Sequence, residues 1–332
     1  MSTHSHNRPW LRTAALAAAG ALLLSACSES GGRPGAADDG ERAGGVSTEE
    51  RDVYLITHAP DGDTFWDFVR AGAEEAASQK NINLIYNNHE EGAEQAELIQ
   101  SAIDSGADGI AVTMAKPEAM TPNVQQAVEA GIPVVSLNAG QEEAFEAGAM
   151  SHFGQDDRVA GEAVGERLAE DGFEHAICVI QVQGHIGLES RCEGVADHIE
   201  SEVLYVEGTD MTQVASTVEA KLETTQEADV IIGLGAPITE TMLDVVDSAG
   251  SEIEVATFDL NSSIVDSILE DELLFAVDQQ PWLQGYLAVD SLWLHFYGGF
   301  EPGGGQPVLT GPAIIDADNA EAIQEYSDEN LR

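Results

Sequence analysis

The sequence predicts an α/β protein built of two lobes, each a doubly wound parallel sheet. From Arg51 onward, short β-branched runs alternate with amphipathic stretches of helical length. Apolar strands separated by helices of about a dozen residues are typical of a parallel sheet covered on both faces. More such units occur than one doubly wound sheet usually holds, and a length of 332 residues suits two domains.

The first set of elements extends to about Met150. Apolar periodicity predicts strands at residues 53–57, 83–86, 109–113 and 134–137, and helices at 65–80, 93–105 and 118–130. The helix at 65–80 carries Phe65, Phe68, Val69, Ala73 and Ala76 on one stripe, which marks its buried face.

The second set follows the same alternation. We expect helices at 157–171, 188–199, 213–225 and 238–249, and strands at 176–181, 202–206, 230–233 and 254–258. Gly106, Gly131 and Gly172 each stand just past a helical run, where a residue with positive φ ends the helix.

Charge excludes several kinds of partner. The chain has 13 Lys and Arg against 60 Asp and Glu, a net charge of −47, and its pI is near 4.1. Such a chain repels phosphate backbones and anionic lipid headgroups, so we expect no nucleic-acid partner and no electrostatic membrane binding.

No sequence motif points to an enzyme. HExxH, a Walker glycine loop, GxSxG and CxxC are all absent from the sequence. Gly233 and Gly235 open a helix, but Ile238 fills the third glycine position of a dinucleotide loop. We therefore expect a protein that is not an enzyme, with no cofactor and no metal.

The N-terminus predicts export and anchoring. Arg8 and Arg12 precede an apolar run at 14–24, too short to span a bilayer, and Leu-Ser-Ala-Cys resembles the lipobox of bacterial lipoproteins. That resemblance implies a signal peptide at 1–26 and lipid attachment at Cys27. Residues 27–50, rich in Gly, Ser and acids, are expected to be a flexible tether. The chain is thus expected outside the cytoplasm, anchored to the cell membrane.

Polar and aromatic residues follow the predicted strands, and parallel sheets bind ligands beyond the carboxyl ends of their strands. These positions are 57–66, Thr113, Asn138, 184–191, Gly235, Asp259 and Gln279. Because these ends meet at one edge of a sheet, the residues are candidates for one binding site.

The layout, together with FWDFVRAGAEEAA, SGADGIAVTMAKPEAM, AGIPVVSLNAG and FDLNSSIVDSI, resembles the periplasmic sugar-binding proteins of the ribose and galactose type. These are type I solute-binding components of ABC importers. The resemblance covers about residues 52–326 and implies two lobes joined by three hinge crossings, near 150–153, 278–280 and 307–310. It gives an N-terminal lobe of 51–150 plus 280–307, and a C-terminal lobe of 151–279 plus 308–332.

The resemblance also assigns site residues. Phe65 and Trp66 match the family's aromatic pair, and Asp63 the polar residue before it. Asp259 matches a sugar-binding aspartate, and Gln279 the hinge amide. His185 and Arg191 match a His and an Arg of the galactose type, and Asn138 a position that often carries Asp or Asn. Thr113 and Glu189 stand where the ribose type has Asn and Arg.

Several of these residues have alternative roles. Phe65 and Trp66 are also suited to anchoring their helix in the core. Asp63 and Asp259 are suited to capping the helices that follow them. Arg191 has nearby Glu189 and Glu193 as ion-pair partners, and His58 either lines the cleft or packs.

The departures from the ribose pattern disfavour ribose itself. The resemblance therefore implies a monomer that binds a small neutral sugar or sugar alcohol and passes it to an ABC permease. Two alternatives stay open. One is a signal-sensing lipoprotein that presents a bound solute, such as a furanosyl autoinducer, to a membrane receptor. The other is a surface glycosidase.

Three cysteines exclude a disulfide-dense scaffold and a zinc-finger array. Cys178 falls in a predicted strand and Cys192 in the next helix, and a bond between them would suit an oxidising compartment. Two buried thiols are the alternative.

Overall fold

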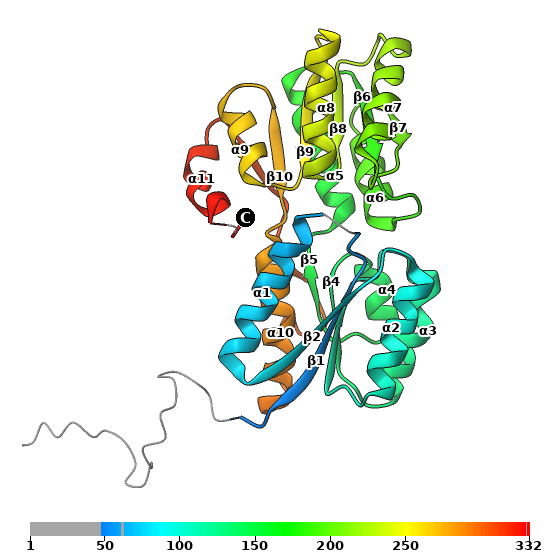
Figure 1. Ribbon diagram of the computed structural model, residues 1–332, viewed down its shortest axis with the longest axis vertical. Helices are drawn as coiled ribbons and strands as arrows, with labels where there is room; N and C mark the ends of the chain where they lie inside the picture. The colour runs from blue at the N-terminus through cyan, green and yellow to red at the C-terminus, as the bar shows by residue number, and fades with distance from the viewer. Residues whose placement is uncertain (1–47, 61–62, 330) are drawn as a thin grey trace, which may run out of the picture. The chain divides into compact units, whose positions relative to one another are not determined.

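The computed structural model describes residues 48–60, 63–329 and 331–332, and these residues form two six-stranded sheets (Figure 1). The strand orders are β11-β5-β4-β3-β1-β2 and β12-β10-β9-β8-β6-β7. Within each sheet the neighbouring strands run parallel, except that β12 is antiparallel to β10. The two α/β lobes expected from the sequence are confirmed.

The first lobe holds the elements from the start of the described chain. These are β1 (Arg51–Thr57), α1 (Phe65–Lys80), β2 (Ile82–Asn88), α2 (Gly92–Asp104), β3 (Gly109–Val112), α3 (Pro117–Glu129), β4 (Val134–Asn138), α4 (Gln141–Glu146) and β5 (His152–Gly154). Two later elements, α10 (Pro281–Gly298) and β11 (Val308–Leu309), return to it.

The second lobe begins with α5 (Asp157–Asp171). It continues with β6 (His175–Ile180), α6 (Ile186–Ala196), β7 (Glu200–Tyr205), α7 (Met211–Thr224), β8 (Val230–Gly233), α8 (Ala236–Ala249), β9 (Glu254–Phe258), α9 (Ser262–Leu269) and β10 (Phe275–Asp278). Its last elements are β12 (Ala313–Asp316) and α11 (Ala320–Asp328).

The chain changes lobe slightly later than the sequence predicts. The strands β5, His152–Gly154, and β11, Val308–Leu309, pair within the first sheet, although the expected boundaries assigned both segments to the C-terminal lobe. Strands of two or three residues are too short to show a hydrophobic periodicity in the sequence. Only their hydrogen bonding to neighbouring strands shows to which lobe they belong. The remaining crossing lies between β10 and α10.

Each sheet is covered on both faces by apolar clusters. In the first lobe, α1 and α10 contribute to one cluster and α2, α3 and α4 to the other. In the second lobe, α5 and α6 cover one face, and α7, α8, α9 and α11 the other. Figure 1 shows α1 beside α10 and α2 beside α3.

Glycines allow two helix pairs to approach closely. A Cβ atom at Gly72 of α1 would lie 1.9 Å from the carbonyl oxygen of Trp282 in α10. Between α5 and α6, a Cβ atom at Gly161 would lie 2.1 Å from the carbonyl oxygen of Arg191. The second contact fixes the helix that carries Arg191 into the candidate site.

The expected signal peptide and the lipidation site Cys27 lie outside the described residues, as does most of the expected tether. Thr48, near the end of that tether, is bound to the first lobe: its hydroxyl donates to the carbonyl oxygen of Lys80 at 3.1 Å. Among the described residues, none of the helices combines the length and apolarity needed to cross a membrane.

Candidate ligand-binding site

A cavity of about 930 Å3 opens at the carboxyl ends of the strands, lined by residues of both lobes. Eight of the ten residues expected to contact ligand line it: Asp63, Phe65, Trp66, Asn138, His185, Arg191, Asp259 and Gln279. They come from segments far apart in the sequence, because parallel strands end at the same edge of each sheet.

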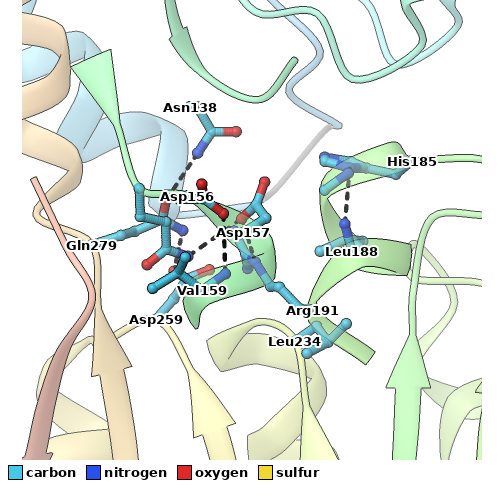
Figure 2. Close-up of polar contacts among 12 residues, drawn as sticks. Asn138, Asp156, Asp157, Val159, His185, Leu188, Arg191, Leu234, Asp259 and Gln279 are labelled. Atoms are coloured by element: carbon cyan, nitrogen blue, oxygen red, sulfur yellow. Dashed lines mark hydrogen bonds and ion pairs between the residues drawn. The ribbon is translucent and has the colours of Figure 1, made fainter. Parts of the chain in front are cut away.

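A chain of amides and a carboxylate connects the lobes beside the hinge (Figure 2). The side-chain nitrogen of Asn138 donates to Oε1 of Gln279 at 3.1 Å, and Nε2 of Gln279 donates to Oδ1 of Asp259 at 2.6 Å. Asn138 is the last residue of β4 and Asp259 follows β9, and both have left-handed backbone, at φ 66° and 69°. Strained backbone of this kind persists where the surroundings hold it, and it is concentrated at functional sites.

Burial dominates the electrostatics of two of the carboxyl groups in the lining, those of Asp259 and Asp63. It raises the pKa of Asp259 to about 7, against the opposing effects of Arg191 and of the hydrogen bond from Gln279. Burial also raises the pKa of Asp63, whose Oδ1 accepts from the backbone N–H of Phe65 at 3.0 Å. The helix after Asp259 is capped by Asn261 instead, so Asp259 is not its cap.

Arg191 is buried and forms an ion pair, but its partner is neither Glu189 nor Glu193, the two residues that the sequence suggested. Its Nε donates to Oδ1 of Asp157 on α5 at 2.8 Å, and its guanidinium carbon lies 4.9 Å from the ring centre of Phe258. Since Asp157 is 34 residues away in sequence, local spacing gave no sign of this pair. The pair holds a cationic group at the cavity wall with most of its charge compensated.

Phe65 and Trp66 occupy the first turn of α1. Their rings meet edge to face, with centroids 5.1 Å apart, and both are buried at 8% and 6% exposure. They belong to the core cluster beneath α1 and also line the cavity. Anchoring of the helix in the core is therefore compatible with a place in the cavity wall, and contact of either ring with a ligand stays a prediction.

Thr113 does not line the cavity. Its hydroxyl is fully buried and contacts the ring Nδ1 of His58 at 2.7 Å and the backbone N–H of His58 at 3.0 Å. Thr113 thus holds His58, which does line the cavity. Direct contact between Thr113 and a ligand stays a prediction, and the structure places its hydroxyl against His58 rather than in the cavity lining.

Glu189 also lies outside the lining. Its carboxylate accepts a hydrogen bond from the hydroxyl of Tyr205 at 3.0 Å, and Tyr205 itself lines the cavity. Sequence reasoning missed further lining residues on the loops, among them Glu90, Glu91, Lys116, Gln181, Gln183, Glu207 and Gln213. Their position a few residues beyond strand ends was the signal that could have found them.

A disulfide joins Cys178 of β6 to Cys192 of α6. Both residues are buried in the cluster between α5, α6 and the sheet. The bond attaches the helix that carries Arg191 to the second sheet.

The fold and the cavity define a class: a two-lobed α/β protein with a polar cavity between its lobes, the architecture of a solute-binding protein. Residues 53–299 match the model of the periplasmic binding protein domain. The chain belongs to that family. The resemblance to sugar-binding members of the ribose and galactose type, expected from the sequence, is confirmed.

Relatives with known names are sugar- and polyol-binding proteins. The xylose/arabinose-binding protein XylF of Sulfolobus acidocaldarius is 26% identical over 59% of this chain and 54% of its own length. A xylitol-binding protein of Mycolicibacterium smegmatis is 28% identical over 52% of this chain and 45% of its own. The chain thus spans about half the length of these two relatives.

A solved structure is more similar. The carbohydrate transporter of Acidothermus cellulolyticus, in complex with myo-inositol, is 44% identical, with a TM-score of 0.84 over 86% of this chain and 100% of that one. A periplasmic sugar-binding protein of an ABC sugar transporter from Legionella pneumophila is 27% identical, with a TM-score of 0.71 over 79% and 99% of the two chains.

Proposed function

We propose that this chain captures a small neutral sugar or sugar alcohol in the cavity between its lobes and delivers it to an ABC permease. The observation that carries the proposal is the hydrogen-bonded series Asn138, Gln279 and Asp259 at the cavity wall. In this series the side-chain amide of Gln279 connects Asn138 of the first lobe to Asp259 of the second. A ligand that contacts both ends of this series stabilises the closed arrangement of the lobes.

The chemistry of the lining supports a neutral, hydroxyl-rich ligand. A carboxylate such as Asp259 accepts from two neighbouring hydroxyls at once, and such charge-assisted hydrogen bonds are about twice as strong as neutral ones. Trp66 and Phe65 supply apolar ring surface for the C–H faces of a sugar or cyclitol.

The charges of the lining disfavour an anionic ligand. The two cationic side chains in the lining are already paired: Arg191 with Asp157 at 2.8 Å, and Lys116 with Glu91 at 3.5 Å. An anionic ligand would have to compete with these carboxylates.

myo-Inositol is the first candidate ligand. It is the molecule bound by the relative that is 44% identical to this chain, and a ring of adjacent hydroxyls matches what Asp259, Asn138 and Gln279 can accept and donate. Pentoses and xylitol follow, because the curated relatives are named for them.

The same proposal covers location and mode of action. The chain acts as a monomer outside the cytoplasm, attached to the membrane through a lipid on Cys27, and releases its ligand unchanged, without catalysis. Membership of the periplasmic binding protein family supports this, and so does the lipobox-like Leu-Ser-Ala-Cys.

A thermal-shift and calorimetry panel tests the ligand class. The purified protein is titrated with myo-inositol, xylitol, pentoses, hexoses and amino acids. A ligand at 100 times its Kd stabilises the fold by about 2.7 kcal/mol, so one or more cyclitols, sugars or polyols should raise Tm by several degrees. Binding of amino acids alone, or of nothing on the panel, would contradict the proposal.

A further inference from the structure

Two buried histidines join the lobes across the cavity. His58 follows β1 in the first lobe, and His185 is the residue before α6 in the second. Their Nε2 atoms lie 3.0 Å apart, and the two residues are only 7% and 4% exposed. Beside them, the backbone N–H of Ile186 donates to the carbonyl oxygen of Ala115 at 3.1 Å, which also joins the lobes.

The surroundings determine which nitrogens carry protons. Nδ1 of His185 accepts from the backbone N–H groups of Gly187 and Leu188, at 3.1 and 3.3 Å. A ring nitrogen that accepts carries no hydrogen, so the neutral imidazole of His185 has its proton on Nε2.

The proton on His185 fixes the state of His58. Because Nε2 of His185 donates, Nε2 of His58 must accept, and its proton resides on Nδ1. That nitrogen then donates to the hydroxyl oxygen of Thr113 at 2.7 Å. The hydrogen bonds therefore all run in one direction, from the backbone N–H groups of α6 through both rings to Thr113 after β3. Each of the four ring nitrogens has a hydrogen-bond partner.

This series has no place for another proton. Protonated His58 would present an N–H to the N–H of His185, and the hydrogen bond between the lobes would be lost. Protonated His185 would direct an N–H at the backbone N–H groups of α6, where the helix dipole also opposes positive charge.

The nearby charges act in the same direction. Arg191 on α6 and Lys116 before α3 lower the pKa of both imidazoles, and burial is the largest cause for each. The pKa of His185 falls to about 3 and that of His58 falls well below its ordinary value.

The carboxyl groups on the elements beside the two histidines either pair with other side chains or are held toward their neutral form. Asp157 on α5 pairs with Arg191, and Glu91 before α2 pairs with Lys116. Asp63 before α1 is itself held toward its neutral form by burial.

We propose that the His58–His185 hydrogen bond is a closing contact between the lobes that forms only when both rings are neutral, so that acidification opens the cavity and releases the solute. The existence of the contact does not depend on which solute is bound. Its effect on affinity rests on the function proposed above.

The direction of the effect follows from proton linkage. When the lobes separate, Nε2 of His58 reaches water and its pKa returns toward the ordinary value near 6.5, whereas Nδ1 of His185 continues to cap α6. The open form therefore binds about one more proton than the closed form below pH 6.5. Affinity is full above that pH and falls about tenfold between pH 7.5 and 5.5.

A nuclear magnetic resonance experiment on the protein saturated with myo-inositol, or with another ligand that the panel identifies, tests the contact itself. With 15N-labelled histidine, a coupling through the hydrogen bond between the two Nε2 atoms is expected at pH 7.5, with His58 protonated on Nδ1. In the unliganded protein the coupling should be weaker at pH 7.5 and absent at pH 5. Absence of the coupling in the ligand-saturated protein at pH 7.5, or the opposite tautomer of His58, would overturn the proposal while leaving the binding function intact.

The affinity of myo-inositol, or of another ligand that the panel identifies, tests the consequence. In Asp259→Asn, where residue 259 cannot titrate, Kd should rise about tenfold from pH 7.5 to 5.5. Adding His58→Phe, which keeps a ring against Trp66, should reduce that change to less than about twofold by the same linkage argument. Retention of the tenfold rise in the double variant would refute the assignment to His58.

Two controls isolate the pair from other titrating groups. His198→Gln alters an exposed histidine at the far end of α6 and, added to Asp259→Asn, should keep the tenfold rise. Asp259→Asn removes the carboxyl whose pKa is about 7 and should also keep the rise, on a weaker baseline affinity. Loss of the rise in Asp259→Asn alone would attribute it to the carboxyl and contradict the proposal.

Discussion

Replacing Asp259 by Asn should weaken ligand binding and, at the same time, stabilise the unliganded protein. The oxygen that accepts from Gln279 at 2.6 Å can be retained by the new amide. The second oxygen becomes an NH2 group, so at least one hydrogen bond from a ligand hydroxyl to a charged acceptor is lost. Such a bond contributes about 1.5–3 kcal/mol, which corresponds to a rise in Kd of roughly 10- to 150-fold.

The stability of the unliganded protein should change in the other direction. The folded chain raises the pKa of Asp259 from 3.8 to about 7, so between these pH values the folded state binds more protons than the unfolded state. Stability therefore falls as the pH rises through this window, by up to about 4 kcal/mol at pH 7 and above. Asn has no charge to bury, and the variant should escape most of this loss.

Calorimetric titration and thermal unfolding at pH 5 and pH 8 measure both effects. Asp259→Asn should show weaker binding, and a Tm above wild type at pH 8 by a margin that is smaller at pH 5. Asp244→Asn, an exposed carboxylate on α8 outside the cavity lining, is the matched control and should change neither property. An unchanged Kd in Asp259→Asn would remove Asp259 from the binding site, and a lower Tm at pH 8 would refute the burial argument.

Three further changes test other parts of the account. Trp66→Leu should raise Kd by up to about tenfold by removing ring surface, measured by calorimetry, and an unchanged Kd would leave Trp66 a core residue alone. Alkylation under denaturing conditions should modify Cys178 and Cys192 only after reduction, and Ser at both positions should lower the free energy of unfolding by about 3 kcal/mol; modification without reductant would refute the bond. Gly161→Ala should lower Tm and weaken binding together, because the new Cβ would lie 2.1 Å from the carbonyl oxygen of Arg191; wild-type values would contradict the close packing of α5 and α6.

The bounds of several elements were predictable because their own apolar pattern and their ends identify them. The apolar stripe of residues 65–80 predicts α1 with its observed bounds, and α5, β8 and β9 also begin and end where the sequence predicts. In each case burial on a sheet face imposes a regular pattern on consecutive residues. The short strands β5 and β11 have no such pattern, which is why the expected lobe boundaries assign them to the other lobe.

The cavity lining was predictable for residues at the end of a strand or directly after it. Asn138, Asp259 and Gln279 stand within one or two residues of a strand end and line the cavity. The partners of these residues were not predictable. The ion pair of Arg191 with Asp157 and the contact of His58 with His185 join residues 34 and 127 positions apart, and three-dimensional packing alone brings them together.

A crystal structure of the protein with the tightest ligand of the panel tests the central claim most directly. The account predicts a cyclitol or sugar ring between the rings of Phe65 and Trp66 and the carboxyl group of Asp259, with Asn138, Arg191 and Gln279 within hydrogen-bond distance of its hydroxyls. A ligand seated outside this cavity, or bound through none of these side chains, would contradict it.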